Sequence, residues 1–225
     1  MLWELVGILH RELKIHRLVP IVTSPSQDQL PDPVFFDPPT SSRDEWLRGN
    51  GLDPARKWIV VIGELSERKC IRELMEAILS DQLRESRWSL LAVGKISAGL
   101  ASDLRMLAEQ NPDLIAVREG FVPDQEFDTW IAHADAVSVL HRNEASSGVL
   151  LKSWAAGACV LAGGAESVLS AAQTLGVAGR RLAEVNAYTI AEALIGLEEA
   201  RMGDSSTPCR SVIEERNLTF FAVNA

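Results

Sequence analysis

AVSVLHRNEASSGVLLKSWAAGACVLAGGAE, residues 136–166, is the stretch of sequence that decides the fold. Two short apolar runs, 136–140 and 159–162, flank a nearly all-apolar segment at 149–156 that has the length of a helix. An unbroken apolar run is typical of a strand that is buried on both of its faces. Strands joined through a helix are parallel, with a right-handed crossover. The stretch therefore predicts a β-α-β unit inside a parallel sheet.

The same alternation of apolar runs and amphipathic segments extends in both directions from this unit. Apolar runs that predict further strands lie at 58–62, 89–93 and 114–117. Amphipathic segments that predict further helices lie around 71–78, 100–107, 127–131, 166–175 and 187–200. We therefore predict an α/β fold with a doubly wound, Rossmann-like parallel sheet.

The predicted sheet occupies the middle of the chain. Residues 1–42 contain a short helix and strand followed by a linker rich in Pro, Ser and Asp, where repeated prolines withhold backbone donors. Residues 43–200 form the predicted Rossmann-like domain, and residues 201–225 form a tail of little periodicity.

Composition excludes several classes of function. The chain has 225 residues and a net charge of -9, so its overall field repels nucleic acid. Its 3 cysteines are odd in number and lack the spacing of a zinc site, which argues against a disulfide framework and a metal site. No apolar stretch is long enough to span a membrane, and no secretory leader is recognised, so we expect a cytoplasmic protein.

Candidate ligand-binding residues follow the predicted strands, because ligands of open parallel sheets bind outside the carboxyl ends of the strands. Gly63 and Glu64 follow the first strand, with Arg68 and Lys69 shortly after them, and Gly94 follows the second strand. The glycines allow a close approach of the backbone, and the two cations can neutralise phosphate. Alternatively, Arg68 and Lys69 are solvated side chains at the start of a helix.

The fourth predicted strand ends in a second group of candidates. His141 ends that strand, and Ser147 and Gly148 stand where they would cap the next helix. Free backbone amides and the helix dipole at this point favour a diphosphate. His141 is either a contact of the sugar or phosphate, or a histidine that bonds only to the backbone.

Four segments resemble the carboxyl-terminal, donor-binding half of retaining GT-B glycosyltransferases of group 1, a family with many bacterial hexosyltransferases. LPDPVFFDPP is similar to the connection that enters this half of the family, and WIVVIGELSERK to its first strand and phosphate-contacting loop. REGFVPDQEFDTWIAHADAVSVL is similar to its third and fourth strands. EASSGVLLKSWAAGACVLAGGAESVL resembles the segment in which two glutamates, seven residues apart, flank a glycine and a helix that touch the donor.

The resemblance assigns expected roles to individual residues. Glu144 matches the first glutamate, a catalytic position near the transferred sugar, and Lys69 matches the lysine at the diphosphate. Lys152 stands where the second, ribose-binding glutamate is usual, and Glu64 stands where an arginine normally assists the lysine. Val122 falls within the part of the match that is expected to bind the donor.

The resemblance implies that the chain moves a hexose from a nucleotide diphosphate sugar to an acceptor with retention of configuration. It implies no cofactor and no metal, and a nucleotide-sugar donor as the ligand. The acceptor-binding domain that precedes this half in the family is absent from the 225 residues, so we expect little activity without that domain or a partner chain. The alternatives are a non-catalytic interaction module that has lost donor binding and a sugar-nucleotide epimerase of similar architecture.

Overall fold

The structure is a computed structural model, and it describes residues 36–144 and 146–203. The predicted helix and strand near the amino terminus, most of the linker, Ala145 and most of the predicted tail lie outside the described residues. The domain boundaries therefore remain predictions.

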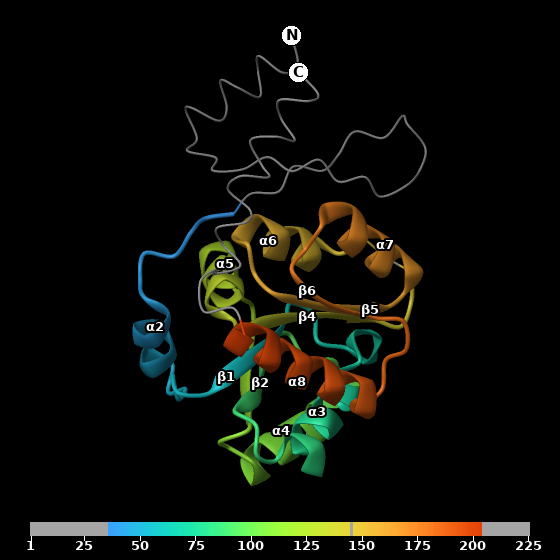
Figure 1. Ribbon diagram of the computed structural model, residues 1–225. Coiled ribbons are helices and arrows are strands. Elements are labelled where there is room, and N and C mark those ends of the chain that lie inside the picture. Colours follow the sequence, from blue (N-terminus) through green and yellow to red (C-terminus); the bar gives the residue numbers. More distant parts are fainter. Residues whose placement is uncertain (1–35, 145, 204–225) are drawn as a thin grey trace.

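Within the described residues, six parallel strands form one sheet in the order β3-β2-β1-β4-β5-β6 (Figure 1). The chain builds outward from β1 to β3 on one side and then from β4 to β6 on the other, which is a doubly wound topology. The predicted α/β fold is thus confirmed. The strands are β1 (Lys57–Ile62), β2 (Trp88–Gly94), β3 (Ile115–Glu119), β4 (Ala136–His141), β5 (Val160–Gly164) and β6 (Gly179–Leu182).

Helices cover both faces of the sheet and enclose two apolar clusters (Figure 1). α3, α4 and α8 pack on one face, and α5, α6 and α7 pack on the other together with α2. The four central strands β2, β1, β4 and β5 are therefore buried on both sides, as their apolar runs predict. The helices are α2 (Arg43–Gly49), α3 (Ile71–Leu79), α4 (Ala98–Gln110), α5 (Asp124–His133), α6 (Gly148–Ala156), α7 (Glu166–Leu175) and α8 (Ala187–Gly203), with the short 3₁₀ turns η1 (Glu67–Lys69) and η2 (Asp81–Leu83).

Two elements were not predicted from the sequence. β6 reads GRRL, a polar segment whose two arginines hide its strand character, and it pairs with β5 only at the edge of the sheet. α2 has 7 residues and begins at a capping box, in which the Ser42 side chain accepts from the Glu45 amide and the Glu45 side chain accepts from the Ser42 amide. A helix this short carries too little periodicity to be recognised.

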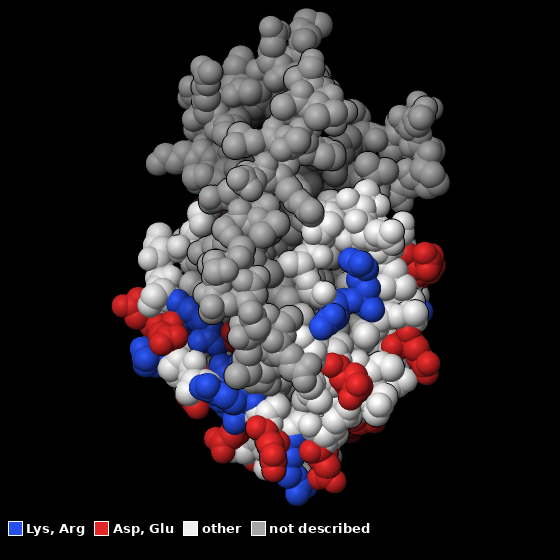
Figure 2. Space-filling model, in the orientation of Figure 1, with Lys and Arg blue, Asp and Glu red and all other residues white. Residues whose placement is uncertain are grey.

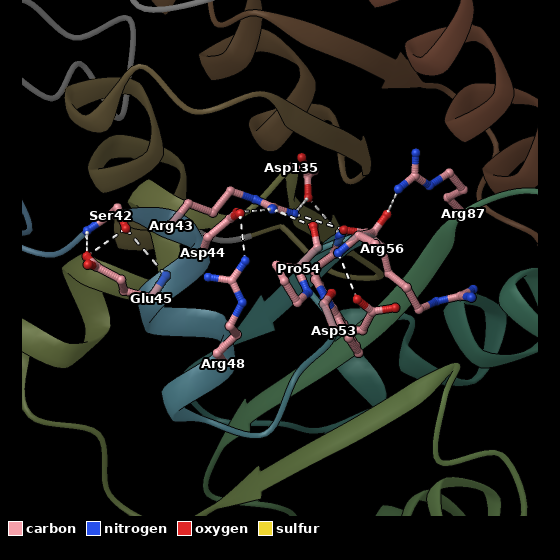
Figure 3. Close-up of polar contacts among 12 residues, drawn as sticks. Ser42, Arg43, Asp44, Glu45, Arg48, Asp53, Pro54, Arg56, Arg87 and Asp135 are labelled. Atoms are coloured by element: carbon pink, nitrogen blue, oxygen red, sulfur yellow. Dashed lines mark hydrogen bonds and ion pairs between the residues drawn. The ribbon is translucent and has the colours of Figure 1, made fainter.

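One ion pair ties α2 to the amino-terminal edge of the sheet (Figure 3). Arg43 donates to Asp135 at 2.6 Å and also to the carbonyl oxygens of Pro54 and Arg56, at 3.0 and 2.9 Å. Asp135 in turn accepts from the Trp58 amide at the start of β1, at 2.9 Å. Because the pair lies at the amino ends of the strands, it stabilises the fold at the edge opposite to the predicted site.

At the carboxyl edge, the chain segments that leave β1 and β2 are joined by backbone hydrogen bonds. The Gly63 amide donates to the Val93 carbonyl at 2.9 Å, and the Leu65 amide donates to the Lys95 carbonyl at 2.8 Å. Gly94 has a φ of +136°, and a Cβ on it would lie 1.8 Å from the Gly63 carbonyl oxygen. The close approach that Gly94 permits is therefore to Gly63, and it sets the course of both loops.

Charge is mixed on the face of the molecule that Figure 2 shows. On the face in Figure 2, acidic and basic side chains alternate, and no large area of a single sign is visible. None of the described helices is both long enough and apolar enough to cross a membrane.

We predict that Gly94→Ala lowers the free energy of unfolding by about 3 kcal/mol or more, because the new Cβ combines a strained φ with a backbone clash. Gly99→Ala is the matched control, since a Cβ at Gly99 in α4 would meet nothing within 4 Å. We expect that control to be neutral or slightly stabilising. Urea unfolding followed by circular dichroism compares the two; equal stability of both variants would contradict the packing described for Gly94.

Candidate functional site

The candidate site lies where the winding of the sheet reverses. β1 and β4 are neighbours, and the chain leaves them toward opposite halves of the sheet. Ligands of such folds bind outside the carboxyl ends of the strands at this reversal. The loop after β1 carries Gly63 and Lys69, and the loop after β4 carries Glu144 and Ser147. The structure thus brings together segments that are about 80 residues apart in the chain.

Lys69 is the buried cation of the site. Its side chain is only 7% exposed, and its ammonium group donates a hydrogen bond to the Ile62 carbonyl oxygen at the end of β1. A Cβ on Gly63 would lie 3.3 Å from the Lys69 Nζ, so a glycine leaves room for the ammonium group. Burial lowers the pKa of Lys69 to about 8, with a further contribution from Arg68. A buried ammonium with a carbonyl as its hydrogen-bond partner is suited to an anion.

Arg68 and Glu64 shift the pKa of Lys69 in opposite directions. Arg68 repels the positive charge of Lys69, whereas Glu64 raises the pKa of Lys69 by attraction. Glu64 itself is exposed, and the backbone of Arg68 accepts a hydrogen bond from the Arg142 amide after β4 at 2.9 Å. That bond fixes η1 against β4 and holds the two cations at the reversal of the sheet.

His141 ends β4 and is buried beside these cations. Its side chain is 3% exposed, and among the described residues its Nδ1 atom has no hydrogen-bond partner. Burial, together with repulsion from Arg68 and Lys69, lowers the pKa of His141 to about 4. The imidazole is therefore neutral at neutral pH.

The amino terminus of α6 faces the same edge of the sheet. The Ser147 side chain accepts from the Leu150 amide at 3.3 Å, so Ser147 caps the helix as its sequence position predicts. The helix itself begins at Gly148. Among the described residues, the amides of Gly148 and Val149 have no acceptor. These amides and the helix dipole provide a place for an anion.

Glu144 is bound to the amino terminus of α7. Its carboxylate accepts from the Glu166 amide at 2.9 Å and from the Ser167 amide at 2.8 Å. Ser167, through its side chain and then its backbone amide, lowers the pKa of Glu144, and the Glu166 amide adds to the effect. The carboxylate therefore acts as a helix cap in this structure, and its expected place near a transferred sugar remains a prediction.

Lys152 is held by a buried acid. Its ammonium group bonds to the Asp128 carboxylate on α5 at 2.5 Å and lies 5.8 Å from the centre of the Phe127 ring. The same ring lies 3.8 Å from the position of a Cβ on Gly63, so Phe127 separates Lys152 from the β1 loop. Lys152 is thus a neighbour of the site, and its expected contact with a donor remains a prediction.

Asp128 is the functional candidate that sequence analysis missed. It is 2% exposed, and besides Lys152 it binds the Asp37 amide of the incoming segment at 2.9 Å. The signal lies in the helical segment FDTWI, where an acid stands directly beside the apolar position Phe127. An acid on the buried side of an amphipathic helix requires a partner, which points to Lys152.

We define the anion seat as Lys69 together with the Gly148 and Val149 amides, and a hollow lies at the same carboxyl edge of the sheet. The hollow has a volume of about 310 Å³ and opens where β2 and β3 end and α5 begins. Phe121 on its rim is 91% exposed, and Val122 contributes to the wall, as does Val93 just before Gly94. This edge of the sheet therefore combines a hollow of mixed polar and apolar lining with the cations of the loop after β1.

The described residues hold no group of three or more His, Cys, Asp or Glu side chains that are placed to bind a metal ion. Cys70 is buried beside Lys69, and burial raises the pKa of its thiol to about 11. A thiol in this state is a poor nucleophile. Cys70 is therefore not a candidate nucleophile at this edge.

Comparison with solved structures places this fold among glycosyltransferases. WaaG, a glycosyltransferase involved in lipopolysaccharide biosynthesis, is similar with a TM-score of 0.54 and 22% identity over 80% of this chain and 50% of that chain. The C-terminal domain of LpcC, a glycosyl transferase group 1 family protein from Francisella tularensis, has a TM-score of 0.54 and 16% identity over 76% of this chain and 87% of that domain. Anabaena Alr3699/HepE in complex with UDP has a TM-score of 0.57 and 16% identity over 80% of this chain and 49% of that chain.

These likenesses show the fold, which is that of the carboxyl-terminal half of GT-B glycosyltransferases. The chain spans about half the length of WaaG and of HepE. No match is found among curated proteins. The model of the family described as Glycosyl transferases group 1 matches residues 56–199, more than half of the chain, and the chain therefore belongs to this family.

Proposed function

We propose that this chain is the donor-binding half of a glycosyltransferase that moves a hexose from a nucleotide diphosphate sugar to an acceptor with retention of configuration. The observation that carries the proposal is the anion seat at the reversal of the sheet. There Lys69 holds a buried ammonium in the loop after β1, and the helix that follows the neighbouring strand β4 begins with amides that have no acceptor among the described residues.

The anion seat matches the chemistry of a diphosphate. Charge-assisted hydrogen bonds from an ammonium and from helix amides are the strongest contacts available to phosphate oxygens. When the bond between sugar and diphosphate breaks, negative charge grows on the leaving oxygen, and a cation already held in place stabilises that charge. Lys69 is held in this way by the Ile62 carbonyl, with Arg68 beside it as a second cation.

The hollow at the ends of β2 and β3 is the place we propose for the nucleobase. Its charged side chains already have partners, because Glu119 binds Arg105 at 2.5 Å and Glu126 accepts from the Trp130 indole at 3.1 Å. What remains for a ligand is the apolar wall, including Val122, with the exposed Phe121 ring on the rim. A flat heterocycle fits between apolar walls and stacks on an aromatic ring.

We expect another domain or another chain to supply the half of the enzyme that binds the acceptor. The described residues form one layered sheet with its site open at one edge, and the solved relatives WaaG and HepE are about twice as long as the matched part. HepE has been solved with UDP, with UDP and glucose, and with UDP-glucose. These complexes make UDP-glucose the first donor to test.

The second candidate function is an interaction module that has lost donor binding. Two observations favour it: Glu144 already caps α7, and Lys152 is engaged by Asp128. In this alternative, the polar groups of the site bind one another and leave no contacts for a donor sugar. Ligand binding separates the two candidates.

We predict that the chain binds UDP-glucose and that Lys69→Met weakens this binding about tenfold to a hundredfold, the range expected for a hydrogen bond to a charged group. Isothermal calorimetry at neutral pH measures both affinities. Lys57→Met is the matched control, because Lys57 begins β1 at the opposite edge of the sheet.

The control should bind with the wild-type affinity. If neither UDP-glucose nor other uridine, guanosine or adenosine diphosphate sugars produce heat with the wild-type chain, the transferase proposal fails. An equal loss in both lysine variants would also contradict it.

We predict that Lys152→Glu lowers the free energy of unfolding by about 3 kcal/mol, because it leaves the buried Asp128 carboxylate without its counter-ion and beside a second carboxylate. Adding Asp128→Asn should recover most of this loss, since an amide oxygen still accepts from the Asp37 amide. Thermal unfolding of the single and double variants measures the difference. Equal instability of both variants would show that Asp128 is not the cause.

The recovered double variant also tests the second candidate function. Combined with Glu64→Arg, it restores the acid and the base that the family resemblance expects at these two positions. The added arginine beside Lys69 should strengthen UDP-glucose binding about twofold to fivefold, the worth of an exposed charge interaction. A triple variant that folds and still binds no sugar nucleotide would support the interaction module.

A further inference from the structure

His141 is a buried titratable group with no part in the function proposed above. Its backbone carbonyl accepts from the Ala165 amide at 2.8 Å, but the Nδ1 atom of its ring has no partner among the described residues. A buried polar atom without a partner is unfavourable, because it has lost its hydrogen bonds to water. Residues that retain such an atom commonly serve a ligand or a reaction.

The position of His141 places its ring at the anion seat. Along β4, Val137 and Val139 point into the apolar cluster that contains α6, and alternation along the strand puts His141 on the same face. From the other side, η1 packs against β4 through the bond between the Arg142 amide and the Arg68 carbonyl. The ring is thus close to Lys69 and to the start of α6.

The charges around His141 keep its ring neutral. Burial and the two cations of η1, Arg68 and Lys69, lower its pKa to about 4. The acids nearby do not offset this effect, since Glu144 is bound to α7 and Glu64 is exposed beside Lys69. The other charged side chains on the elements packed around it are Glu67 in η1, Arg142 after β4 with its partner Glu73 in α3, Lys152 in α6 and Glu166 at the start of α7.

We propose that His141 is a further donor-binding residue, neutral in the empty site and protonated when the diphosphate of a sugar nucleotide binds beside it. This inference rests on the proposed function of the same site. Two phosphate groups bring negative charge next to a ring whose pKa is lowered by the charges of Arg68 and Lys69, and this opposes the effect of the two cations. The proton comes from solvent and adds to a ring nitrogen, and no other bond forms or breaks.

The proposal gives donor binding a defined pH dependence. In the empty site the pKa of His141 is about 4, and beside a bound diphosphate we expect it to return toward its ordinary value of about 6.5. A group whose pKa rises on binding takes up a proton, so affinity increases as the pH falls through the pKa of the complex. Between about pH 7 and pH 6 the affinity should rise about threefold.

Lys69 gives donor binding a second pH dependence, in a range separate from that of His141. The pKa of its ammonium group is about 8 in the empty site and should rise when an anion binds. Proton uptake by Lys69 therefore occurs above about pH 8, where His141 stays neutral in both states. The two residues can be distinguished by the pH at which uptake is observed.

The test measures protons taken up per bound UDP-glucose, from calorimetry in buffers of different ionisation enthalpy. UDP-glucose is the correct probe because its diphosphate is esterified at both ends and keeps its charge, whereas UDP itself titrates near neutral pH. At about pH 6 we expect uptake of about three-quarters of a proton. The measurement stays at or above this pH because the chain, with a net charge of -9 at pH 7, approaches neutrality in more acidic solution.

Three variants give the test its controls. His141→Gln should bind UDP-glucose but lose the uptake at about pH 6, and Lys69→Arg should keep that uptake but lose the one above about pH 8. His133→Gln removes the other histidine of the described residues, at the end of α5, and should leave both uptakes unchanged.

The outcomes separate this inference from the function on which it rests. If His141→Gln binds UDP-glucose with the same proton uptake as the wild type, the inference is overturned and the proposed function stands. If no sugar nucleotide binds the wild type, both fail. Should His141→Gln not fold, the imidazole carbon resonances of wild-type His141, recorded across pH with and without UDP-glucose, give the same answer: an unchanged titration overturns the inference.

Discussion

A buried ammonium at the reversal of the sheet is the interaction on which the rest of the site depends. Removing Lys69 from water is unfavourable, and the Ile62 carbonyl at the end of β1 offsets only part of that cost. The depressed pKa of Lys69 reflects the remainder. The sheet fixes where this ammonium lies, because the glycine at position 63 leaves room for it and the loop after β2 holds Gly63 in place. Under the proposed function, an anion bound beside this ammonium would offset the remaining cost of burying it.

The sequence predicted the central strands and the common edge of their loops well. It did not predict the hydrogen-bond partners of the side chains at that edge. Continuous apolar runs identify buried strands, and the rule for carboxyl ends of parallel strands correctly brought Lys69, His141 and Ser147 to one edge. β6 was missed because an edge strand needs no apolar run. The partners of Glu144 could not be predicted, because its bonds to α7 depend on how β5 places that helix, and spacing along the chain contains no such information.

The helix starts of α6 and α7 at this edge differ in how their first amides are satisfied. Glu144 fills the positive end of α7, whereas the comparable end of α6 has Ser147 as a neutral cap and leaves its first amides without an acceptor among the described residues. An anion that enters the site therefore meets one helix start that is already neutralised and one that is not. This asymmetry favours negative charge at the start of α6 over the start of α7.

Asp128 also binds the segment that leads into the domain. One buried carboxylate binds both Lys152 in α6 and the amide of Asp37, and Phe36 is buried in the apolar cluster that contains α6. The direction in which the chain enters the domain is therefore set by a group that also holds the helix behind the anion seat. A change in the charge of Asp128 or Lys152 would alter the incoming segment and the helix together. If an acceptor domain is attached through this segment, its orientation toward the site is constrained at the point where α5 and α6 meet.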